Sequence, residues 1–236
     1  MENKIQILST KPIGAELARI AGDHNICIDE VPFIETEEIV SEELKKRIAA
    51  LSQQNITAVF TSANAVNAVK KLLPAKPSWK IFYIGHQTKN SAADTFSEKN
   101  IIGIADDGEE LGEEIIKQSS AKKIIFFCGN QRRDVLPEKL KKHGIELEEI
   151  VVYKTIEKSR IISKHYDGIL FFSPSGVRSF FSVNKINEPV QLFAIGATTA
   201  KEIKTYSQLP VIIPEHPDKE KLVQLVIKHF STIKSF

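Results

Sequence analysis

The chain has 236 residues, of which 42% are hydrophobic and 26% charged, enough apolar material for one large domain or two smaller lobes. Its 32 basic and 30 acidic side chains leave a formal net charge of +2, too small an excess to indicate a dedicated nucleic-acid binder. No stretch approaches the roughly 18 consecutive apolar residues of a membrane span, and no apolar signal-peptide region follows Met1, so we expect a soluble, cytoplasmic protein without membrane partners.

Short apolar runs alternate with amphipathic stretches along nearly the whole chain. The predicted strands are Ile5–Leu8, Ala58–Phe60, Ile81–Ile84, Ile101–Ile104, Lys123–Phe127, Gly168–Phe172, Leu192–Ile195 and Val211–Ile213. The predicted helices between them include Ser41–Gln53, Asn64–Leu73, Gly112–Gln118, Leu136–His143 and Lys219–His229. Apolar strands that alternate with helices are typical of parallel sheets covered on both faces. The sequence therefore predicts an α/β fold with parallel sheets flanked by helices.

Two segments break this alternation, Ile28–Ile39 and Leu147–Glu157. Each follows a helix and a glycine, carries a strand-like run interrupted by Pro32 or Tyr153, and leads into charged sequence. We expect these segments to be two crossover strands that join two lobes.

An internal repeat at an offset of 111 residues supports this division. The run Phe60–Val66 matches Phe171–Val177, and the match continues without insertion from residues 60–116 to residues 171–227. Chance similarity in one short motif would not persist over so long a segment. The repeat therefore predicts two similar lobes, each a parallel sheet flanked by helices.

A looser match indicates how the two lobes are assembled. Residues 7–32 and residues 125–153 share the order strand, basic turn, helix, glycine and second strand. The first segment is completed by the repeat unit at 171–227, and the second by the unit at 60–116. Two crossings between lobes suit a hinge that closes over a ligand in a cleft. The sequence therefore predicts a discontinuous lobe of residues 1–34 and 156–236, a continuous lobe of residues 38–152, and crossovers at 35–37 and 153–155.

Hydroxyl residues follow strands at equivalent positions of the repeat. Ser62 and Ser173 come directly after apolar strands, and Thr88 and Thr199 follow strand–glycine turns, each at a predicted helix start. Taken singly, such residues are helix caps. Both lobes, however, place these helix starts at the carboxyl edge of a parallel sheet, where α/β proteins bind ligands and where a helix N-terminus attracts anions. Four such starts would suit a ligand with many carboxylates.

Glycines and basic residues lie beside these helix starts. Gly85 and Gly196 would let a ligand approach the backbone closely. Arg133, in the turn after a strongly apolar strand, has a looser counterpart in Lys11 after the first strand, so each lobe would offer an anion contact in the matching loop. The alternative is a turn with solvated arginines, which is our interpretation of Arg132.

The sequence contains no motif for a metal site, for nucleotide binding or for a catalytic nucleophile. Cys27 and Cys128 are far apart and form no zinc pattern, so we expect reduced, buried thiols, with a single disulfide as the alternative. The six histidines show no metal-ligand spacing, and there is no phosphate-binding loop, dinucleotide fingerprint or nucleophile elbow. The sequence therefore predicts neither a metal nor another cofactor.

Tyr153 lies on the second predicted crossover, between apolar Val151-Val152 and polar Lys154-Thr155. The ordinary interpretation is a half-buried strand aromatic with its hydroxyl in water. On a hinge strand beneath a cleft, that hydroxyl would instead be placed to donate a proton to a leaving group.

Together, five motifs resemble the uroporphyrinogen-III synthase family and occur in the expected order over essentially the whole chain. They are Phe60–Val66, Cys128-Gly129-Asn130 with Arg133, Val151–Thr155, Phe171–Val177 and Phe193–Ala200. Two positions depart from the commoner pattern. Lys11 stands where an arginine is usual, which keeps the charge but loses bidentate carboxylate binding. Asp218 stands where a threonine is usual; it can cap a helix but would repel an anionic substrate.

The resemblance implies a cofactor-free, monomeric lyase of tetrapyrrole and heme synthesis. Its substrate would be hydroxymethylbilane, a linear tetrapyrrole with eight carboxylates, which is cyclised with loss of water and inversion of ring D to uroporphyrinogen III. Tyr153 matches the family's candidate tyrosine and would be the catalytic proton donor. The expected substrate-binding residues are Lys11, Ser62, Gly85, Thr88, Gly129, Arg133, Ser173, Gly196, Thr198 and Thr199. The alternative function is a two-lobed hinge protein that binds a small polyanionic ligand without chemistry.

Overall fold

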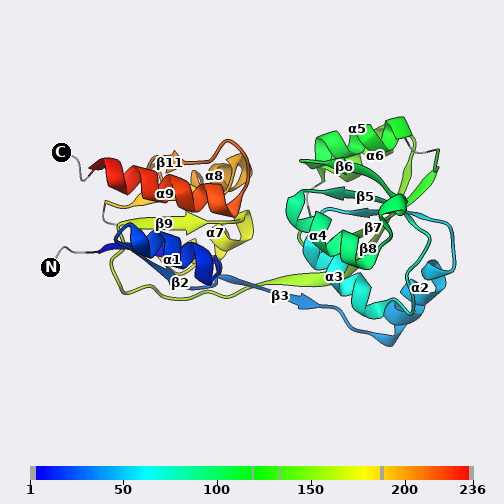
Figure 1. Ribbon diagram of the computed structural model, residues 1–236, viewed down its shortest axis with the longest axis horizontal. Helices are drawn as coiled ribbons and strands as arrows, with labels where there is room; N and C mark the ends of the chain where they lie inside the picture. The colour runs from blue at the N-terminus through cyan, green and yellow to red at the C-terminus, as the bar shows by residue number, and fades with distance from the viewer. Residues whose placement is uncertain (1–3, 119, 133, 187–188, 234–236) are drawn as a thin grey trace. The chain divides into compact units, whose positions relative to one another are not determined.

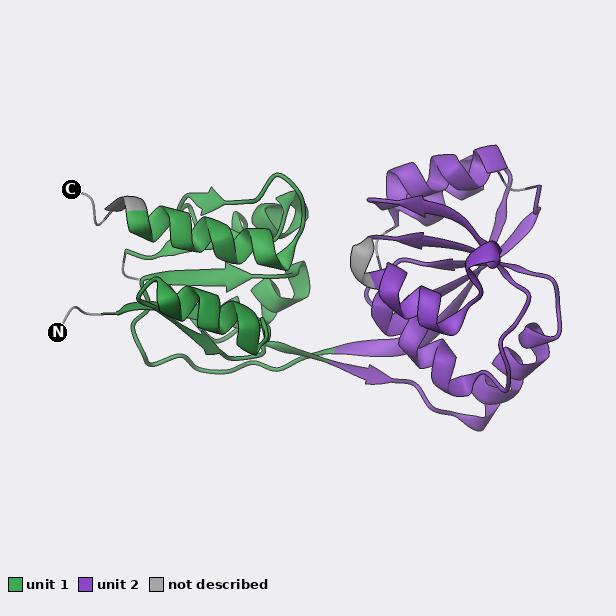
Figure 2. Ribbon diagram, viewed as in Figure 1, with its two compact units in different colours: residues 1–35, 156–236 green, residues 36–155 purple. Residues whose placement is uncertain are grey.

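The computed structural model describes residues 4–118, 120–132, 134–186 and 189–233 (Figure 1). The chain forms two compact units (Figure 2). Unit 1 comprises Met1–Glu35 and Ile156–Phe236, and unit 2 comprises Thr36–Thr155. The chain therefore passes from one unit to the other twice, after Glu35 and after Thr155.

Unit 1 contains a five-stranded sheet in the order β11-β10-β9-β1-β2, and its strand pairs are parallel. The strands are β1 (Ile5–Ser9), β2 (Ile26–Glu30), β9 (Gly168–Phe171), β10 (Gln191–Ala194) and β11 (Val211–Ile212). The helices are α1 (Ala15–Asp23), α7 (Pro174–Phe181), α8 (Ala197–Ile203) and α9 (Lys219–Ile233).

Each face of this sheet is covered by a pair of helices, because successive strand residues point to opposite faces. Phe171 packs in a cluster with residues of α7 and α8, whereas its neighbour Leu170 packs in a cluster with residues of α1 and α9. Figure 1 shows α1 and α9 together on one face of the sheet. Apolar strands buried on both sides are the reason that the sequence shows continuous apolar runs here.

Unit 2 contains a six-stranded sheet in the order β3-β8-β7-β4-β5-β6. The strands are β3 (Ile34–Glu38), β4 (Thr57–Phe60), β5 (Lys80–Ile84), β6 (Ile101–Ala105), β7 (Lys123–Gly129) and β8 (Glu146–Glu157). The helices are α2 (Glu42–Ser52), α3 (Ala63–Leu72), α4 (His86–Thr95), α5 (Gly108–Gln118) and α6 (Val135–Lys142), with a short 3-10 helix at Glu98–Asn100. Residues of α2, α3 and α4 pack on one face and residues of α5 and α6 on the other.

The internal repeat has a direct structural counterpart. The elements β4, α3, β5, α4 and α5 start 111 residues before β9, α7, β10, α8 and α9. The neighbours agree as well, since the strand order β5-β4-β7-β8 in unit 2 corresponds to β10-β9-β1-β2 in unit 1. The predicted fold class, two similar α/β lobes with parallel sheets flanked by helices and joined by crossover strands, is confirmed.

The two crossover segments differ from each other. Residues 28–39 are divided between β2 and β3 at Pro32, which lacks the N–H that a strand ladder requires. Residues 147–157 form one continuous strand, so the interruption predicted at Tyr153 is absent. Instead the register with β7 shifts there: Cys128 lies opposite Val151, but Gly129 lies opposite Tyr153. The irregularity leaves Val152 without an opposite residue in this ladder.

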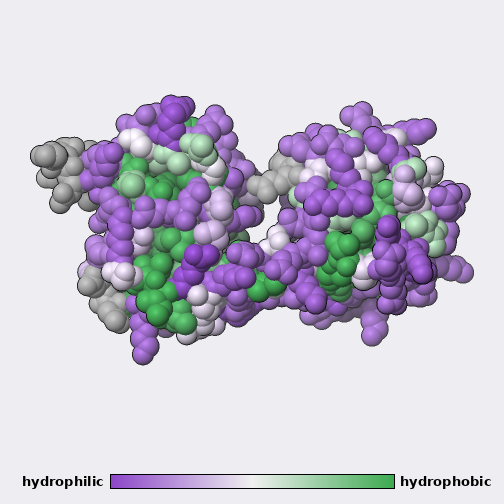
Figure 3. All heavy atoms as spheres, turned by 90° about the horizontal axis from the view of Figure 1, so that it is seen from below, coloured by the Kyte–Doolittle hydropathy of each residue, from purple (hydrophilic) through white to green (hydrophobic). Residues whose placement is uncertain are grey.

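Figure 3 shows that hydrophilic side chains cover most of the visible face of each unit, with smaller apolar areas between them. Within the part of the chain that the structure describes, no helix is both long and apolar enough to cross a membrane.

Candidate functional site

In unit 1 the predicted site residues fall at the carboxyl ends of three neighbouring strands. Lys11 follows β1, Ser173 follows β9 and Gly196 follows β10, and Thr198 and Thr199 lie in the first turn of α8. Because these strands are parallel and adjacent in the sheet, their carboxyl ends share one edge.

Unit 2 repeats this arrangement. Ser62 follows β4, Gly85 follows β5, Gly129 is the last residue of β7, and Tyr153 lies opposite it on β8. These strands are also neighbours, so these residues share the carboxyl edge of the second sheet. Arg133 lies outside the described residues.

The two serines are helix caps, as their ordinary interpretation predicts. The Ser62 hydroxyl oxygen accepts a hydrogen bond from the Asn64 N–H at 3.2 Å, and that of Ser173 accepts one from the Gly176 N–H at 3.1 Å. Each bond satisfies one of the free N–H groups at the start of a helix, α3 or α7. Among the described residues the Ser62 hydroxyl donates no hydrogen bond, so its proton is available to a ligand acceptor.

The two threonines are not helix caps, and that interpretation of Thr88 and Thr199 is wrong. The N-cap residues of α4 and α8 are Gly85 and Gly196, which have no side chain to accept a hydrogen bond. Thr88 and Thr199 are therefore the third residues of their helices. Both are 3% exposed, and among the described residues neither hydroxyl has a hydrogen-bond partner. The starts of α4 and α8 thus keep N–H groups that no cap side chain satisfies.

Gly85 and Gly196 occupy equivalent positions but differ in backbone conformation. Gly85 has φ 79° and ψ 157°, a region that essentially only glycine adopts. Gly196 has φ 179°, which is extended backbone open to any residue. An added Cβ at Gly85 would meet no atom within 4 Å, and one at Gly196 would touch Pro217 at an ordinary 3.4 Å. Space is therefore open at both turns, but only Gly85 is required by the backbone.

This difference predicts unequal effects of alanine at the two sites. Gly85→Ala should lower the free energy of unfolding of unit 2 by about 1–3 kcal/mol, because it forces a side chain into a glycine-only conformation. Gly196→Ala should leave the stability of unit 1 nearly unchanged. Thermal unfolding of the two variants beside the parent measures this, and equal losses would contradict the assigned backbone conformations.

A second lysine, Lys219, lies near Lys11, and it was not predicted from the sequence as a site residue. Partial desolvation and the nearby charge of Lys219 lower the pKa of the Lys11 ammonium from its usual value of 10.5. Lys219 is the first residue of α9, and Asp218 before it accepts a hydrogen bond from the Lys221 N–H at 2.9 Å. In the sequence, the helix-capping residue Asp218 indicated that Lys219 lies in the first turn of α9. The two lysines give the edge of unit 1 a local positive charge.

The start of α1, beside Lys11, is occupied by a carboxylate of the chain itself. One carboxylate oxygen of Glu30 accepts hydrogen bonds from the Ile13 N–H at 2.8 Å and from the Gly14 N–H at 3.1 Å. A helix start in this fold therefore binds a carboxylate, as the sequence predicts for the other helix starts.

The Tyr153 ring packs directly against the backbone of Gly129. A Cβ atom at Gly129 would lie 2.5 Å from Cζ of the Tyr153 ring and 2.8 Å from its hydroxyl oxygen. The ring is half-buried and packs against the hydrophobic cluster between the sheet of unit 2 and α2, α3 and α4. Within the described residues the Tyr153 hydroxyl has no hydrogen-bond partner, so it is free to meet a ligand. Gly129 therefore has a structural role, because a side chain at this position would displace the tyrosine ring.

The arginine in the following turn is paired, so the interpretation of Arg132 as a solvated side chain is wrong. Its guanidinium binds the Glu149 carboxylate through two nitrogens, with Nη2 2.7 Å from Oε1, and also contacts Asp134. These partners raise the pKa of Arg132 above its already high value. Arg132 thus ties the turn after β7 to strand β8.

The two cysteines are unpaired. Cys27 and Cys128 are both free, which confirms the expectation of unpaired thiols and excludes the alternative of a disulfide, but the expectation that both are buried is wrong for Cys27, which is only partly buried. Cys128 is 2% exposed, and its burial, together with the charge of Glu149, raises the pKa of its thiol to about 11. A thiol of this kind is inert at neutral pH.

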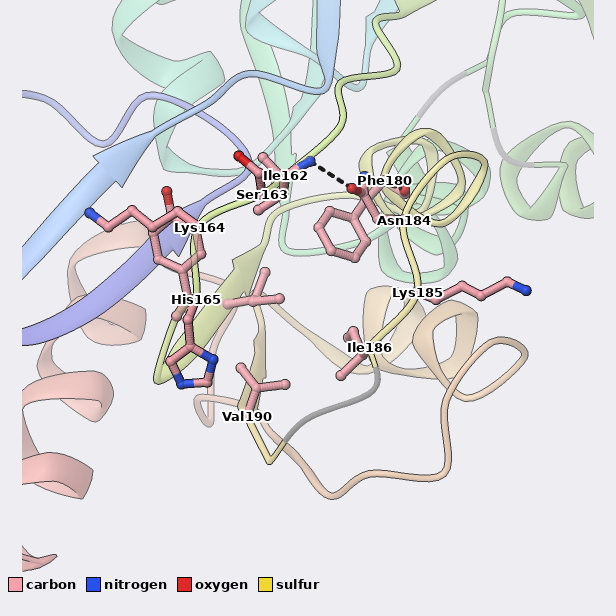
Figure 4. A pocket seen from close by; sticks show the side chains of 11 residues that line it. Ile162, Ser163, Lys164, His165, Phe180, Asn184, Lys185, Ile186 and Val190 are labelled. Carbon is pink, nitrogen blue, oxygen red and sulfur yellow. Dashed lines mark hydrogen bonds between the residues drawn. The ribbon is translucent and has the colours of Figure 1, made fainter.

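Two cavities lie at the opposite edges of the sheets. One, of about 240 Å³ in unit 1, is lined by residues 162–166 before β9 and by Ile186 and Val190 before β10 (Figure 4). The Lys185 side chain points away from it. The other, of about 300 Å³ in unit 2, is lined by residues 55–57 at the start of β4 and by Lys123 at the start of β7. Both cavities therefore lie at amino edges, away from the candidate site.

The geometry defines a class of protein. The chain carries two doubly wound parallel sheets, each with glycine turns, uncapped helix starts and hydroxyl groups at its carboxyl edge. This is the edge where open α/β sheets bind ligands, and helix starts favour anionic groups. The class is a two-unit α/β protein whose sheets each carry open helix starts at the carboxyl edge.

The comparisons with known proteins identify the family. The family model described as uroporphyrinogen-III synthase HemD matches residues 15–224, and the chain belongs to this family. A uroporphyrinogen-III synthase of Saccharomyces cerevisiae is 26% identical over 129 residues, 47% of this chain and 47% of that protein. The match to this curated relative thus spans about half of its length.

Two solved structures share the fold. A mutant uroporphyrinogen III synthase from the extremely thermophilic bacterium Thermus thermophilus aligns with a TM-score of 0.66 and 14% identity, covering 97% of this chain and 99% of that one. A uroporphyrinogen-III synthetase from Helicobacter pylori aligns with a TM-score of 0.66 and 18% identity, covering 95% of this chain and 99% of that one.

Proposed function

We propose that this protein is a uroporphyrinogen-III synthase, a lyase of tetrapyrrole and heme synthesis. It cyclises hydroxymethylbilane with loss of water and inversion of ring D to give uroporphyrinogen III. The observation that carries the proposal is the family match over residues 15–224, and the two carboxyl edges with open helix starts support it.

Substrate binding follows from the charge of the ligand. A tetrapyrrole with eight carboxylates needs many anion contacts, and helix N-termini, hydroxyl groups and cations supply them. In unit 1 we assign this role to Lys11, Ser173, Gly196, Thr198 and Thr199, joined by Lys219, and in unit 2 to Ser62, Gly85, Thr88, Gly129 and Arg133.

In the proposed chemistry Tyr153 is a general acid. Its hydroxyl donates a proton to the terminal hydroxyl of hydroxymethylbilane, which then leaves as water. Ring closure proceeds through a spiro intermediate, in which one α-carbon of ring D carries both methylene bridges. The bond from that carbon to the methylene of ring C then breaks and re-forms at the other α-carbon of ring D, which inverts the ring. A proton released from the substrate during closure returns to the tyrosine, so the catalyst is regenerated and the net loss is one water molecule.

The second part of catalysis is orientation. Unassisted closure gives the symmetrical isomer I, so the protein must stabilise the transition state of the spiro route more than that of direct closure. Carboxylate contacts serve this purpose, because they restrict the conformations of a flexible chain. The proposal includes a monomeric, cytoplasmic enzyme that requires no metal or other cofactor.

The test is conversion of freshly prepared hydroxymethylbilane by the purified protein, without added metal or nucleotide. After oxidation, chromatography of the porphyrins should show isomer III in excess over a heat-denatured control. Isomer I alone, formed at the rate without enzyme, would refute the enzyme and favour the alternative of a polyanion-binding hinge protein.

A further inference from the structure

Asn130, the residue after β7, makes two hydrogen bonds to strand β8. Its backbone N–H donates to the Tyr153 carbonyl oxygen at 3.2 Å. Its side-chain Oδ1 accepts from the Thr155 N–H at 2.8 Å. The two bonds lie on either side of Lys154, so one asparagine holds β8 just past the tyrosine.

The Asn130 contact lies where the pairing of β7 with β8 ends. The regular pairing of β7 with β8 ends at Gly129 and Tyr153, after the register shift. Thr155 is also the last residue of unit 2, so the strand leaves the unit immediately beyond the contact. The Asn130 side chain thus replaces the ladder hydrogen bond that β7 no longer provides.

An ordinary turn preference does not account for the asparagine. Asparagine is favoured in turns because it tolerates positive φ, but among the described residues the non-glycine residue with positive φ is Asn25, not Asn130. The Asn130 side chain is exposed, so it does not fill the core either. What the side chain supplies here is its acceptor oxygen.

We propose that Asn130 is a positioning residue for Tyr153. By fixing β8 on both sides of Lys154, it keeps the tyrosine ring seated on Gly129 and its hydroxyl at the carboxyl edge of the unit 2 sheet. This inference rests on the proposed function, because it assigns a task to Asn130 in the reaction of Tyr153.

Two substitutions separate the acceptor from the shape of the side chain. Asn130→Leu keeps the size but has no acceptor, and Asn130→Asp keeps the acceptor oxygen. We expect Asn130→Leu to lower kcat for isomer III about 10-fold with little change in KM, since small misplacements of a catalytic group are costly. Asn130→Asp should recover most of kcat, with a higher KM because of its negative charge. Equal loss of kcat in both variants would overturn the proposal.

A double substitution shows whether Asn130 acts through the tyrosine. In a Tyr153→Phe protein the hydroxyl is already absent, so adding Asn130→Leu should lower kcat little further. If the two losses multiply instead, Asn130 acts independently of Tyr153 and the proposal fails. The same holds if Tyr153→Phe alone leaves kcat at the parent value.

An exchange measurement tests the contact without any activity. The Thr155 amide should exchange with solvent about 3- to 10-fold faster in Asn130→Leu than in the parent, and at the parent rate in Asn130→Asp, as NMR can measure. If the parent makes no isomer III, the proposed function fails, while this result still supports the contact. Unchanged Thr155 exchange in Asn130→Leu would overturn the inference whatever the activity.

Discussion

Replacing Tyr153 with phenylalanine should lower kcat for isomer III about 10²–10⁴-fold, the usual contribution of a general acid. The change removes a hydroxyl that has no hydrogen-bond partner among the described residues, and the ring can still pack on Gly129. Stability and product affinity should therefore change little. Steady-state kinetics with hydroxymethylbilane and fluorescence titration with the product measure the two effects separately.

Tyr83→Phe is the matched control. Tyr83 lies on β5 in the same unit, is 0% exposed, and its hydroxyl also has no partner within the described part of the chain. Burial raises the pKa of this phenol, so it stays neutral. Removal of a buried hydroxyl without a partner should leave kcat unchanged and cost no stability. If the Tyr153→Phe variant has the parent kcat, Tyr153 only lines the site, and the proton comes from bound water or a substrate carboxyl.

Gly129→Ala should have the second largest effect, through the same tyrosine. The new Cβ would lie 2.5 Å from the Tyr153 ring, so the ring must move by about 1 Å to reach normal contact distance. A displacement of that size at a catalytic group can cost about 10²-fold in rate. We also expect a loss of about 1–3 kcal/mol in stability from overpacking. Kinetics and thermal unfolding of the same preparation give both values.

Gly103→Ala provides the control for overpacking alone. A Cβ at Gly103 would lie 2.5 Å from the Phe82 ring, a clash of the same size in the same unit, but Phe82 is buried in the core rather than at the site. This variant should lose similar stability and keep the parent kcat in its folded fraction. A Gly129→Ala protein with the parent kcat would show that the position of the tyrosine hydroxyl does not limit the reaction.

The strand pair that carries the tyrosine extends further in unit 2 than its counterpart in unit 1. By position in the sheets, β1 and β2 of unit 1 correspond to β7 and β8 of unit 2. The last pair of β1 and β2, Ser9 opposite Glu30, corresponds by register to Phe126 opposite Glu149, and the pairing of β7 with β8 continues to Gly129 opposite Tyr153. The Glu30 carboxylate is engaged by the start of α1, whereas the Tyr153 hydroxyl has no partner among the described residues. We therefore assign proton donation to unit 2 and carboxylate binding to both units.

The sequence by itself determined the fold class and the repeat. Apolar strands and amphipathic helices are local patterns, so Ile81–Ile84 was predicted within one residue of β5 (Lys80–Ile84). The ends of elements were predicted less closely. Helix α5 begins at Gly108, four residues before its predicted start at Gly112, because the Asp107 carboxylate caps it by accepting from the N–H groups of Glu109 and Glu110.

The tertiary structure decided where the candidate site residues lie and what they contact. Thr88 and Thr199 lie inside their helices because the preceding glycines take the cap positions, and only backbone angles reveal this. The seat of Tyr153 on Gly129 depends on a register shift between two strands that a helix separates in the chain. Hydrophobic periodicity reports the conformation of a segment, but register, ion pairing and contact between distant segments are set by packing, which the sequence pattern does not encode locally.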